Sequence, residues 1–317
     1  ALTALCAPGE NVREGFKRRL METPGVVASM GEKPIGASLV LTARYPAVPD
    51  VISNALYDLR RNMTTAWGEV VEDGIALARH ARQLSAGFYY RWVWPNNEPD
   101  TEWLYARADW HRELRHHLKR NIKGCDSPFL VGAAIARGDI ESETYDAWCA
   151  VRDRYKPHPP VEAVWLSDFL IHDIVAWLKD CGSEGGIAWY EHTAVANRLR
   201  QFGVNVFGSG PQASVGILEC KGGPIAASIA AHGTGKNLQD RWSRNLTITA
   251  PSGAMKWHQK LARTHRHGQK ADEVTCDVYQ HTQELREAFG AAVENSHYLK
   301  IMGGKQKLLI ASRVDFR

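Results

Sequence analysis

Residues 161–293 alternate between short apolar runs and amphipathic stretches, and this alternation constrains the fold more than any other feature. The apolar runs predict strands, at 186–190, 204–207, 225–230, 245–249 and 274–279. The amphipathic stretches predict helices, at 161–179, 193–201, 255–266 and 283–293. Strands alternating with helices over about 130 residues predict an α/β fold, with a parallel sheet covered by helices on both faces. Ligands of such sheets bind at the carboxyl ends of the strands.

The first 160 residues carry a different pattern, which is mainly helical. Apolar residues recur at helical spacing within 55–92, 103–123 and 141–155, whereas 37–42 is strand-like. The Pro-His-Pro-Pro segment at 157–160 excludes helix and forces extended backbone. We therefore predict a domain boundary there, between a mainly helical region at 1–160 and the sheet domain at 161–317.

Length and composition indicate a folded protein of about two domains, because 317 residues can bury a substantial core. The net charge of +4 is too small to indicate a polyanionic partner by itself. Six scattered cysteines form no C-x-x-C pair, and neither a signal peptide nor an apolar run of about 18 residues is present. We expect a cytoplasmic protein with no membrane partner. Because the chain begins at Ala1 rather than Met, we also expect a piece of a longer polypeptide.

The strongest local charge lies at 241–270, where seven Lys or Arg residues occur without a single Asp or Glu. Gln259, Arg263 and Arg266 are spaced by four and three residues there, so on a helix all three would point one way. Two guanidinium groups projected together suit the oxygens of a polyphosphate, since each offers a planar fork of donors. Spacing alone leaves a solvated basic helix as an equal alternative.

Two strings of residues resemble motifs of the Swi/Snf-like ATPases in helicase superfamily two. Residues 259–269, Gln-Lys-Leu-Ala-Arg-Thr-His-Arg-His-Gly-Gln, resemble motif six, which reads approximately Q-x-x-x-R-x-H-R-x-G-Q. Residues 233–239, Gly-Thr-Gly-Lys-Asn-Leu-Gln, resemble motif five, usually G-T-G-L-N-L-Q. The two occur in the family's order with a strand between them. A weaker resemblance to motif four covers the apolar strand at 186–190 and the Glu-His-Thr that follows it.

This resemblance implies that the sheet domain is a second RecA-like lobe, preceded by a helical region and carrying an unfamiliar insertion at 95–160. In this family the nucleotide lies between two such lobes. The resemblance implies that Arg266 is a catalytic arginine finger and Arg263 its partner. It further implies that Gln259, Gly233 and Gly235 contact the nucleotide. The compact lobe and the insertion suggest a phage-encoded member, which would work in the cytoplasm of its host.

The same resemblance implies contacts with nucleic acid, most simply double-stranded DNA, from Thr234, Lys236, Asn237 and Thr193. ATP and Mg would be held mainly by a first lobe of the same polypeptide, because this chain contains no G-K-[ST] string and no D-E-x-H box. We therefore expect the C-terminal part of an ATP-dependent DNA translocase or helicase that is inactive alone.

Two other functions remain as alternatives. One is a non-catalytic nucleic-acid-binding module with a RecA-like fold. The other is a stand-alone P-loop NTPase, because Gly-Thr-Gly-Lys at 233–236 imitates the end of a phosphate-binding loop. Ala230 replaces the first Gly of that loop, however, and Asn237 replaces the hydroxyl residue that would bind magnesium. The P-loop reading is therefore disfavoured.

The helical region contains two weaker candidates. A basic run on the 103–123 helix could contact phosphates, although a solvated helix face is favoured; it comprises His111, Arg112, Arg115, His116, His117, Lys119 and Arg120. The aromatic run at 88–94 could stack bases, although core packing is favoured. His265 and His267 have no nearby Cys, and no H-E-x-x-H string occurs, so we expect no metal site.

Overall fold

The computed structural model describes residues 6–24, 35–68, 71, 74–120, 125, 127–156, 158–302 and 307–316. Its strands are β1 (Ser38–Arg44), β2 (Phe88–Trp92), β3 (Val161–Trp165), β4 (Ile187–Tyr190), β5 (Asn205–Phe207), β6 (Ile225–Ser228), β7 (Arg244–Thr247), β8 (Glu273–Tyr279) and β9 (Arg313–Asp315). Its helices are α1 (Val12–Glu22), α2 (Asp50–Asn62), α3 (Gly74–Ser85), α4 (Thr101–Lys119), α5 (Pro128–Ala136), α6 (Glu143–Val151), α7 (Phe169–Asp180), α8 (Thr193–Gln201), α9 (Pro211–Glu219), α10 (Ile229–His232), α11 (Ala254–Leu261), α12 (Gln283–Ile301) and α13 (Leu308–Ala311).

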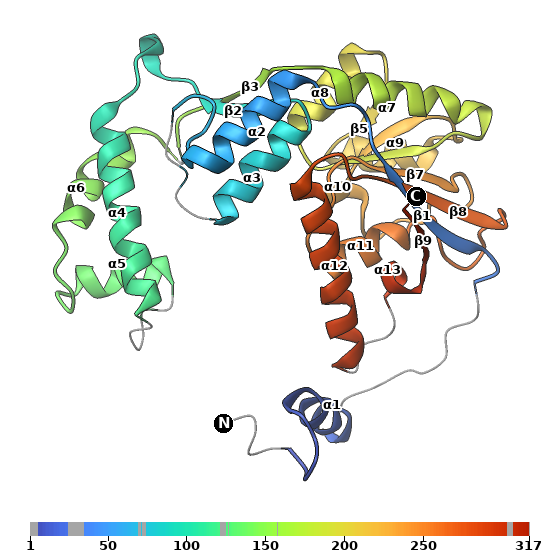
Figure 1. The fold of residues 1–317 in the computed structure, drawn as a ribbon, viewed down its shortest axis with the longest axis horizontal. Coiled ribbons are helices and arrows are strands. Elements are labelled where there is room, and N and C mark those ends of the chain that lie inside the picture. The colour runs from blue at the N-terminus through green and yellow to red at the C-terminus, as the bar shows by residue number, and fades with distance from the viewer. Residues whose placement is uncertain are drawn as a thin grey trace.

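A seven-stranded sheet forms the main body of the molecule (Figure 1), in the order β5-β6-β4-β7-β8-β1-β9. Every neighbouring pair of strands is parallel. The predicted α/β fold with a parallel sheet is therefore confirmed, and the part of the chain before the sheet domain is mainly helical, as expected. The predicted domain boundary at residue 160 stays a prediction. The sheet nevertheless takes β1 from the far side of that boundary.

Alternation of side chains along the strands gives the sheet two apolar faces. On one face, Ala188 and Tyr190 of β4 pack with α7 and α8. On the other face, Ile187 and Trp189 pack with α9, and the β1 and β8 side chains pack with α11, α12 and α13. Helices thus cover both faces of the sheet, which leaves the ends of the strands for ligands.

The predicted helix at 161–179 is wrong over its first residues, because 161–165 forms strand β3. This strand pairs antiparallel with β2, from Phe88 opposite Trp165 to Trp92 opposite Val161. The prolines before Val161 favour extended backbone, and β-branched residues favour strands, which explains the difference. The prediction of helix through 88–92 is wrong for the same reason, since these residues form β2.

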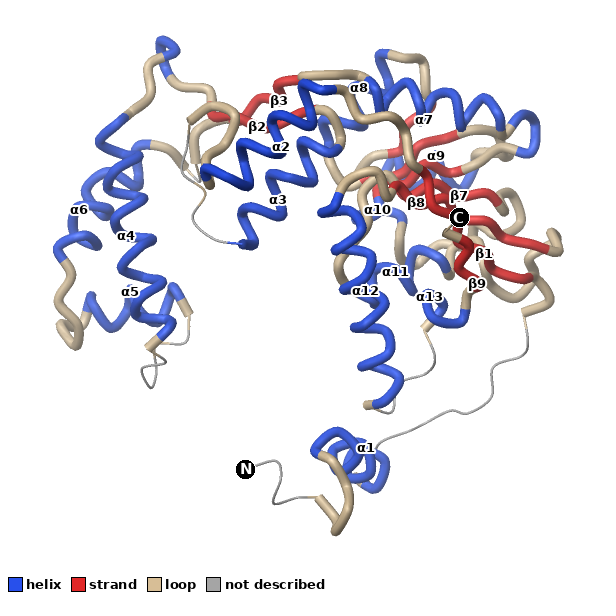
Figure 2. The backbone as a smooth tube through the Cα atoms, viewed as in Figure 1, coloured by secondary structure: helices blue, strands red, loops and turns tan. Residues whose placement is uncertain are grey.

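A small helical module made of α4, α5 and α6 lies at the far end of the β2–β3 ribbon (Figure 2). Its own core contains Trp110, Leu114 and Val131, which are all buried. Asp100 accepts a hydrogen bond from the Trp103 backbone and so begins α4. The predicted helix at 103–123 ends at Lys119, and its last residues, 121–123, lie outside the described residues. None of the described helices has the length and apolar composition that a membrane span requires.

Candidate nucleotide and nucleic-acid interface

The two motif-like loops, 233–239 and 259–269, contact each other beside the sheet. The first leaves the carboxyl end of β6, whereas the second reaches the amino ends of β1 and β7, where His265 and Gln269 bond to the carbonyls of Ala37 and Trp242. The first follows β6 and the short helix α10, and the second follows β7 and begins within α11. The Leu238 backbone N–H donates to the carbonyl of Arg263, with 3.1 Å between N and O. In return, Nη1 of Arg263 donates to the carbonyl of Lys236 over 2.9 Å. The fold therefore joins two strings that are about 25 positions apart in the chain.

The helix predicted at 255–266 ends at Leu261, so Arg263 and Arg266 do not share a helix face with Gln259. They lie in the turn that follows α11. Nε of Arg263 donates to the carbonyl of Gln259 over 2.9 Å, and Nη1 of Arg266 donates to Oδ1 of Asn237. The predicted helical geometry is therefore wrong, because the first turn after the helix is organised by hydrogen bonds to loop 233–239.

Arg263 and Arg266 form a local concentration of positive charge. Burial lowers the pKa of Arg263, and the nearby Arg266 charge lowers it further. In the described part of the chain, neither guanidinium forms an ion pair with a carboxylate. Two adjacent cations that lack an acidic partner leave a field that an anion such as a phosphate group would neutralise.

The glycines of loop 233–239 are required by the backbone. A Cβ on Gly233 would lie 2.5 Å from the carbonyl oxygen of Ile229, which is too close for any side chain. Gly235 has a φ of +70°, a left-handed conformation that glycine adopts without strain. The loop is therefore tight, and it leaves Thr234 and Asn237 exposed to solvent.

Lys236 occupies a different position from the other residues of its loop, because its side chain is buried. Its ammonium donates to Oγ of Ser214 and to the Ser214 carbonyl in α9. The lysine thus ties the loop to α9, and the Gly-Thr-Gly-Lys string does not present its ammonium to solvent. The predicted contact of Lys236 with nucleic acid stays a prediction. Because its ammonium is bonded to Ser214, such a contact would have to come from the backbone at 234–237.

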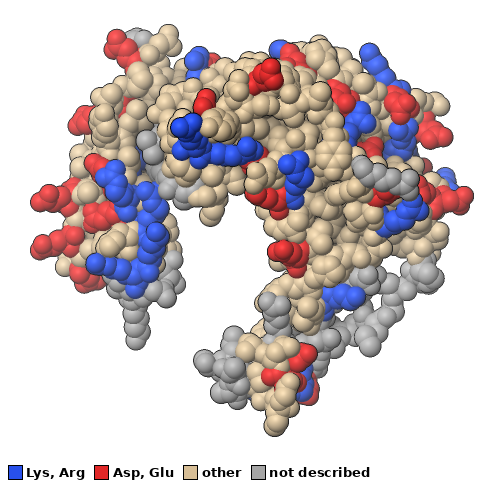
Figure 3. All heavy atoms as spheres, viewed as in Figure 1, with Lys and Arg blue, Asp and Glu red and all other residues tan. Residues whose placement is uncertain are grey.

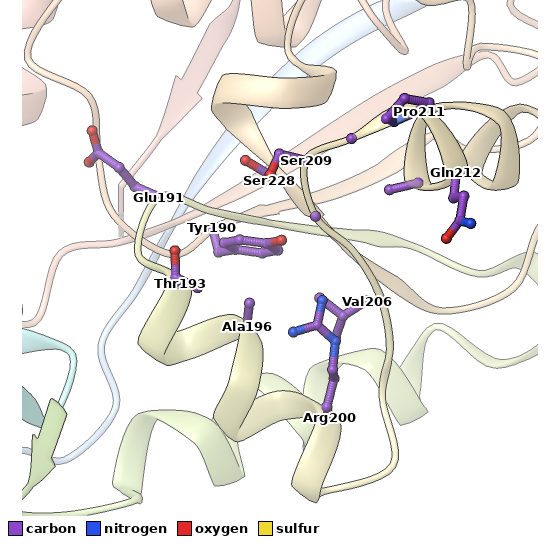
Figure 4. Close-up of a pocket in the computed structure, with 13 residues that line it drawn as sticks. Tyr190, Glu191, Thr193, Ala196, Arg200, Val206, Ser209, Pro211, Gln212 and Ser228 are labelled. Carbon is purple, nitrogen blue, oxygen red and sulfur yellow. The ribbon is translucent and has the colours of Figure 1, made fainter. Parts of the chain in front are cut away.

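A cavity of about 600 Å³ opens beside β4, β5 and β6 at the carboxyl edge of the sheet (Figure 4). Thr193, the first residue of α8, and Arg200 line one side of this cavity. Ser209 and Gln212 line the opposite side. The sequence prediction included Thr193 but missed the other three. The Gly-Ser-Gly-Pro string at 208–211 could have indicated them, since Pro favours the first turn of a helix.

A smaller cavity of about 180 Å³ brings Gln259 together with Gly233 and Thr234. Glu191 and Lys256 complete this part of the lining, and their charged atoms are 3.8 Å apart. Three of the predicted site residues thus border one space, although they come from different loops. Arg263 and Arg266 do not line it.

Lys260 belongs to the basic window in the sequence but not to the surface, because its side chain is fully buried. Its ammonium donates to Thr247, lies 3.6 Å from Sγ of Cys276 and sits 4.0 Å from the centre of the Trp257 ring. Burial lowers the pKa of Lys260 below its ordinary value of 10.5. The positive field at the surface is therefore smaller than the residue count suggests.

We expect Lys260→Met to stabilise the protein by about 1–3 kcal/mol at pH 7, because it replaces a buried charge with an apolar side chain of similar length. The native protein binds fewer protons at Lys260 than the unfolded chain does between the lowered pKa and 10.5. Its stability therefore rises with pH through that window, and the advantage of Met shrinks and then disappears. Urea unfolding at several pH values measures both effects; an equal advantage at all pH values would contradict them.

Comparisons with known proteins add one structural similarity. The chain is similar to the crystal structure of the C-terminal part of the Fun30 ATPase domain, with a TM-score of 0.42 and 12% sequence identity. The match covers 84% of this chain and 96% of that one. No family model and no curated protein sequence matches. Within the described residues, no group of three or more His, Cys, Asp or Glu is arranged to hold a metal ion.

Proposed function

We propose that this chain is the second RecA-like lobe of an ATP-dependent DNA translocase of the Swi/Snf-like type. The observation that carries the proposal is the pairing of Arg263 and Arg266 in one loop that is hydrogen-bonded to loop 233–239. Both arginines lie against loop 233–239 without an acidic partner among the described residues. Such a pair fits the triphosphate of ATP bound on a facing lobe.

In this role, the residues of the chain act on the phosphates and do not carry the nucleotide by themselves. Arg266 would place its guanidinium against the transferring phosphoryl group, and Arg263 would hold the loop in position through its bonds to the carbonyls of Lys236 and Gln259. Gln259, Gly233 and Gly235 would border the nucleotide. ATP with Mg supplies the phosphoryl group, and its binding residues would come mainly from the first lobe of the same polypeptide.

The nucleic-acid track would run along the cavity beside α8. Thr193 and Thr234 are exposed hydroxyl residues at this edge, and Asn237 is exposed and bonded to Arg266. Hydroxyl and amide side chains, with Arg200, suit the phosphate oxygens of a DNA backbone, and such contacts position a duplex without reading its sequence. The hydrogen bond between Arg266 and Asn237 would couple a DNA contact at Asn237 directly to the nucleotide contact at Arg266.

The proposal predicts that the isolated chain hydrolyses no ATP above background, whereas the polypeptide that also carries a first lobe is stimulated by duplex DNA. The reason is that half of the catalytic groups lie on each lobe. Steady-state ATPase assays with and without DNA test this on both proteins. Turnover by the isolated chain would favour a stand-alone NTPase, and no turnover by the longer protein would favour a non-catalytic nucleic-acid-binding module.

A further inference from the structure

A second hollow lies far from the sheet edge, between α3, the β2–β3 ribbon and the helical module. It consists of two cavities of about 500 and 510 Å³. Both are lined by Trp67, Trp92 and Arg107, so they adjoin one another. The aromatic run at 88–94 and the basic run on α4, which are separate in the sequence, meet here.

The walls of the hollow combine aromatic rings with arginines. The guanidinium of Arg107 lies over the ring of Trp92, 5.2 Å from its centre, and 5.8 Å from that of Trp103. Tyr105 is 72% exposed although it is a large aromatic residue on a helix. Exposed rings interleaved with arginines are the combination by which proteins stack the bases and hold the phosphates of a single strand.

The hollow also contains buried polar atoms that make no well-aligned hydrogen bond with the described residues. They are Oε1 of Gln83, Nε1 of Trp103 and Nδ1 of His80, whose residues all line the 510 Å³ cavity. Gln83 and Trp103 are 5% and 2% exposed. Burial, and then the charge of Arg79, lowers the pKa of His80 to about 4, against a raising effect of the neighbouring Gln83 side chain, so its ring is neutral at pH 7. Buried polar groups are normally paired, so these atoms indicate a polar ligand.

Arginine is the commonest charged residue of the lining that the structure describes. Arg107, Arg112 and Arg115 line the 500 Å³ cavity. Among its described lining residues the acidic one is Asp109, which pairs with Arg112 over 2.7 Å. Arg79 adds a further positive charge to the adjoining cavity. Figure 3 shows Lys and Arg gathered over the flank of the module that faces the rest of the molecule, with Asp and Glu along its outer edge. The hollow is thus on the positive side of the module.

We propose that this hollow binds a segment of single-stranded nucleic acid, with its bases against the accessible rings of Trp92 and Tyr105, a base edge facing Gln83, and the neighbouring phosphates held by the arginines of α4. A nucleobase offers both a π face for the rings and donors and acceptors for the unpaired polar atoms. A base paired inside a duplex offers neither, because its edge and both faces are occupied. This site uses no residue of the proposed translocase edge and does not depend on that function.

The experiment is fluorescence anisotropy with labelled oligo-dT and oligo-U of about 12 nucleotides, within the size range of single-strand sites, and with a duplex of the same length. Tyr105→Ala is expected to weaken single-strand binding about tenfold, since stacking on one ring contributes about 1–3 kcal/mol. Arg112→Ala is expected to reduce the slope of single-strand affinity against salt concentration by the amount that about one phosphate contact contributes. The two oligonucleotides show whether the strand is DNA or RNA.

Two further variants separate a binding role from a structural one. Gln83→Met removes a buried oxygen that has no well-aligned hydrogen bond with the described residues, so the urea midpoint is expected to stay equal or rise while single-strand affinity falls about threefold or more. Arg137→Ala removes one exposed positive charge from α5, outside the hollow, and is the matched control. It is expected to leave affinity within about twofold of the unchanged protein, as the exposed pair it breaks is weak.

The proposal is overturned if Tyr105→Ala and Gln83→Met both bind single strands as the unchanged protein does, or if they weaken duplex binding equally. Thr234→Ala and Asn237→Ala at the sheet edge make failure of the two proposals distinguishable. They are expected to weaken duplex binding and leave the hollow's single-strand binding unchanged. A variant that loses only duplex binding or only single-strand binding therefore assigns the lost activity to the site that carries the substitution.

Discussion

Replacing Arg266 by Ala is expected to lower DNA-stimulated ATP hydrolysis about 10³-fold or more in the polypeptide that carries both lobes, since arginine fingers contribute about 10³–10⁵ in rate. Arg266 is half-buried, and its guanidinium donates a hydrogen bond to Asn237. Arg266→Lys is expected to recover little, because an ammonium keeps the charge but loses the planar fork of donors. Single-turnover measurement of phosphate release, with ATP saturating, separates this loss from weaker nucleotide binding.

Lys270→Ala is the matched control for Arg266→Ala, since it removes a positive charge from the same basic window at an exposed position. Its hydrolysis rate is expected to stay within about twofold of the unchanged enzyme, because screening weakens exposed charges. Wild-type turnover by Arg266→Ala would remove the finger assignment. Equal losses in both variants would show that the total charge of the window matters and not the geometry of one residue.

The second large effect is expected at Asp173, whose replacement by Ala should destabilise the protein by about 2–4 kcal/mol. Asp173 accepts two hydrogen bonds from the Arg44 guanidinium, of 2.5 and 2.9 Å, and one of 2.5 Å from the Tyr279 hydroxyl. The hydrogen bonds between Arg44 and the Asp173 carboxylate raise the pKa of Arg44 above its ordinary value. Removing the carboxylate leaves a partly buried charge and a buried hydroxyl without their partner.

Urea unfolding with a matched control measures this effect. Asp180 also pairs with an arginine, Arg244, but its side chain is 75% exposed, whereas that of Asp173 is 22% exposed. Asp180→Ala is therefore expected to cost no more than about 1 kcal/mol. If Asp173→Ala and Asp180→Ala had the same unfolding midpoint, the network that joins α7 to β1 and β8 would contribute nothing beyond a surface ion pair.

The central strands of the sheet were predictable from the sequence because they are short, mostly buried apolar runs, whereas the exposed edge strand β9 was missed. The run at 186–190 contains β4, whose four residues are all buried, and 274–279 lies within β8. Helix α8 has the predicted bounds. Strand β3 was missed because Trp165 and Phe169 fit helical spacing, whereas its true partner is β2, about 70 residues earlier. Pairing across that distance leaves no local pattern.

The candidate site was predictable at the level of loops and less so at the level of side chains. The strings at 233–239 and 259–269 were found from their residues, but a helix was assumed to aim the arginines. Arg263 is instead positioned by the carbonyl groups of Gln259 and Lys236, and Arg266 by the side chain of Asn237, which no spacing rule contains. Lys236 and Lys260 both count as charges in the sequence, whereas the fold buries them.

The position of β1 in the sheet determines when the molecule can fold. Ser38 and Glu273 are neighbours in the sheet, although they are 235 positions apart in the chain. During synthesis β1 emerges early, and its buried residues Leu39 and Leu41 have no partner until β8 has been made. Contacts at such separation slow folding and prolong the exposure of apolar strands. We therefore expect the nascent chain to depend on chaperones until its last strands leave the ribosome.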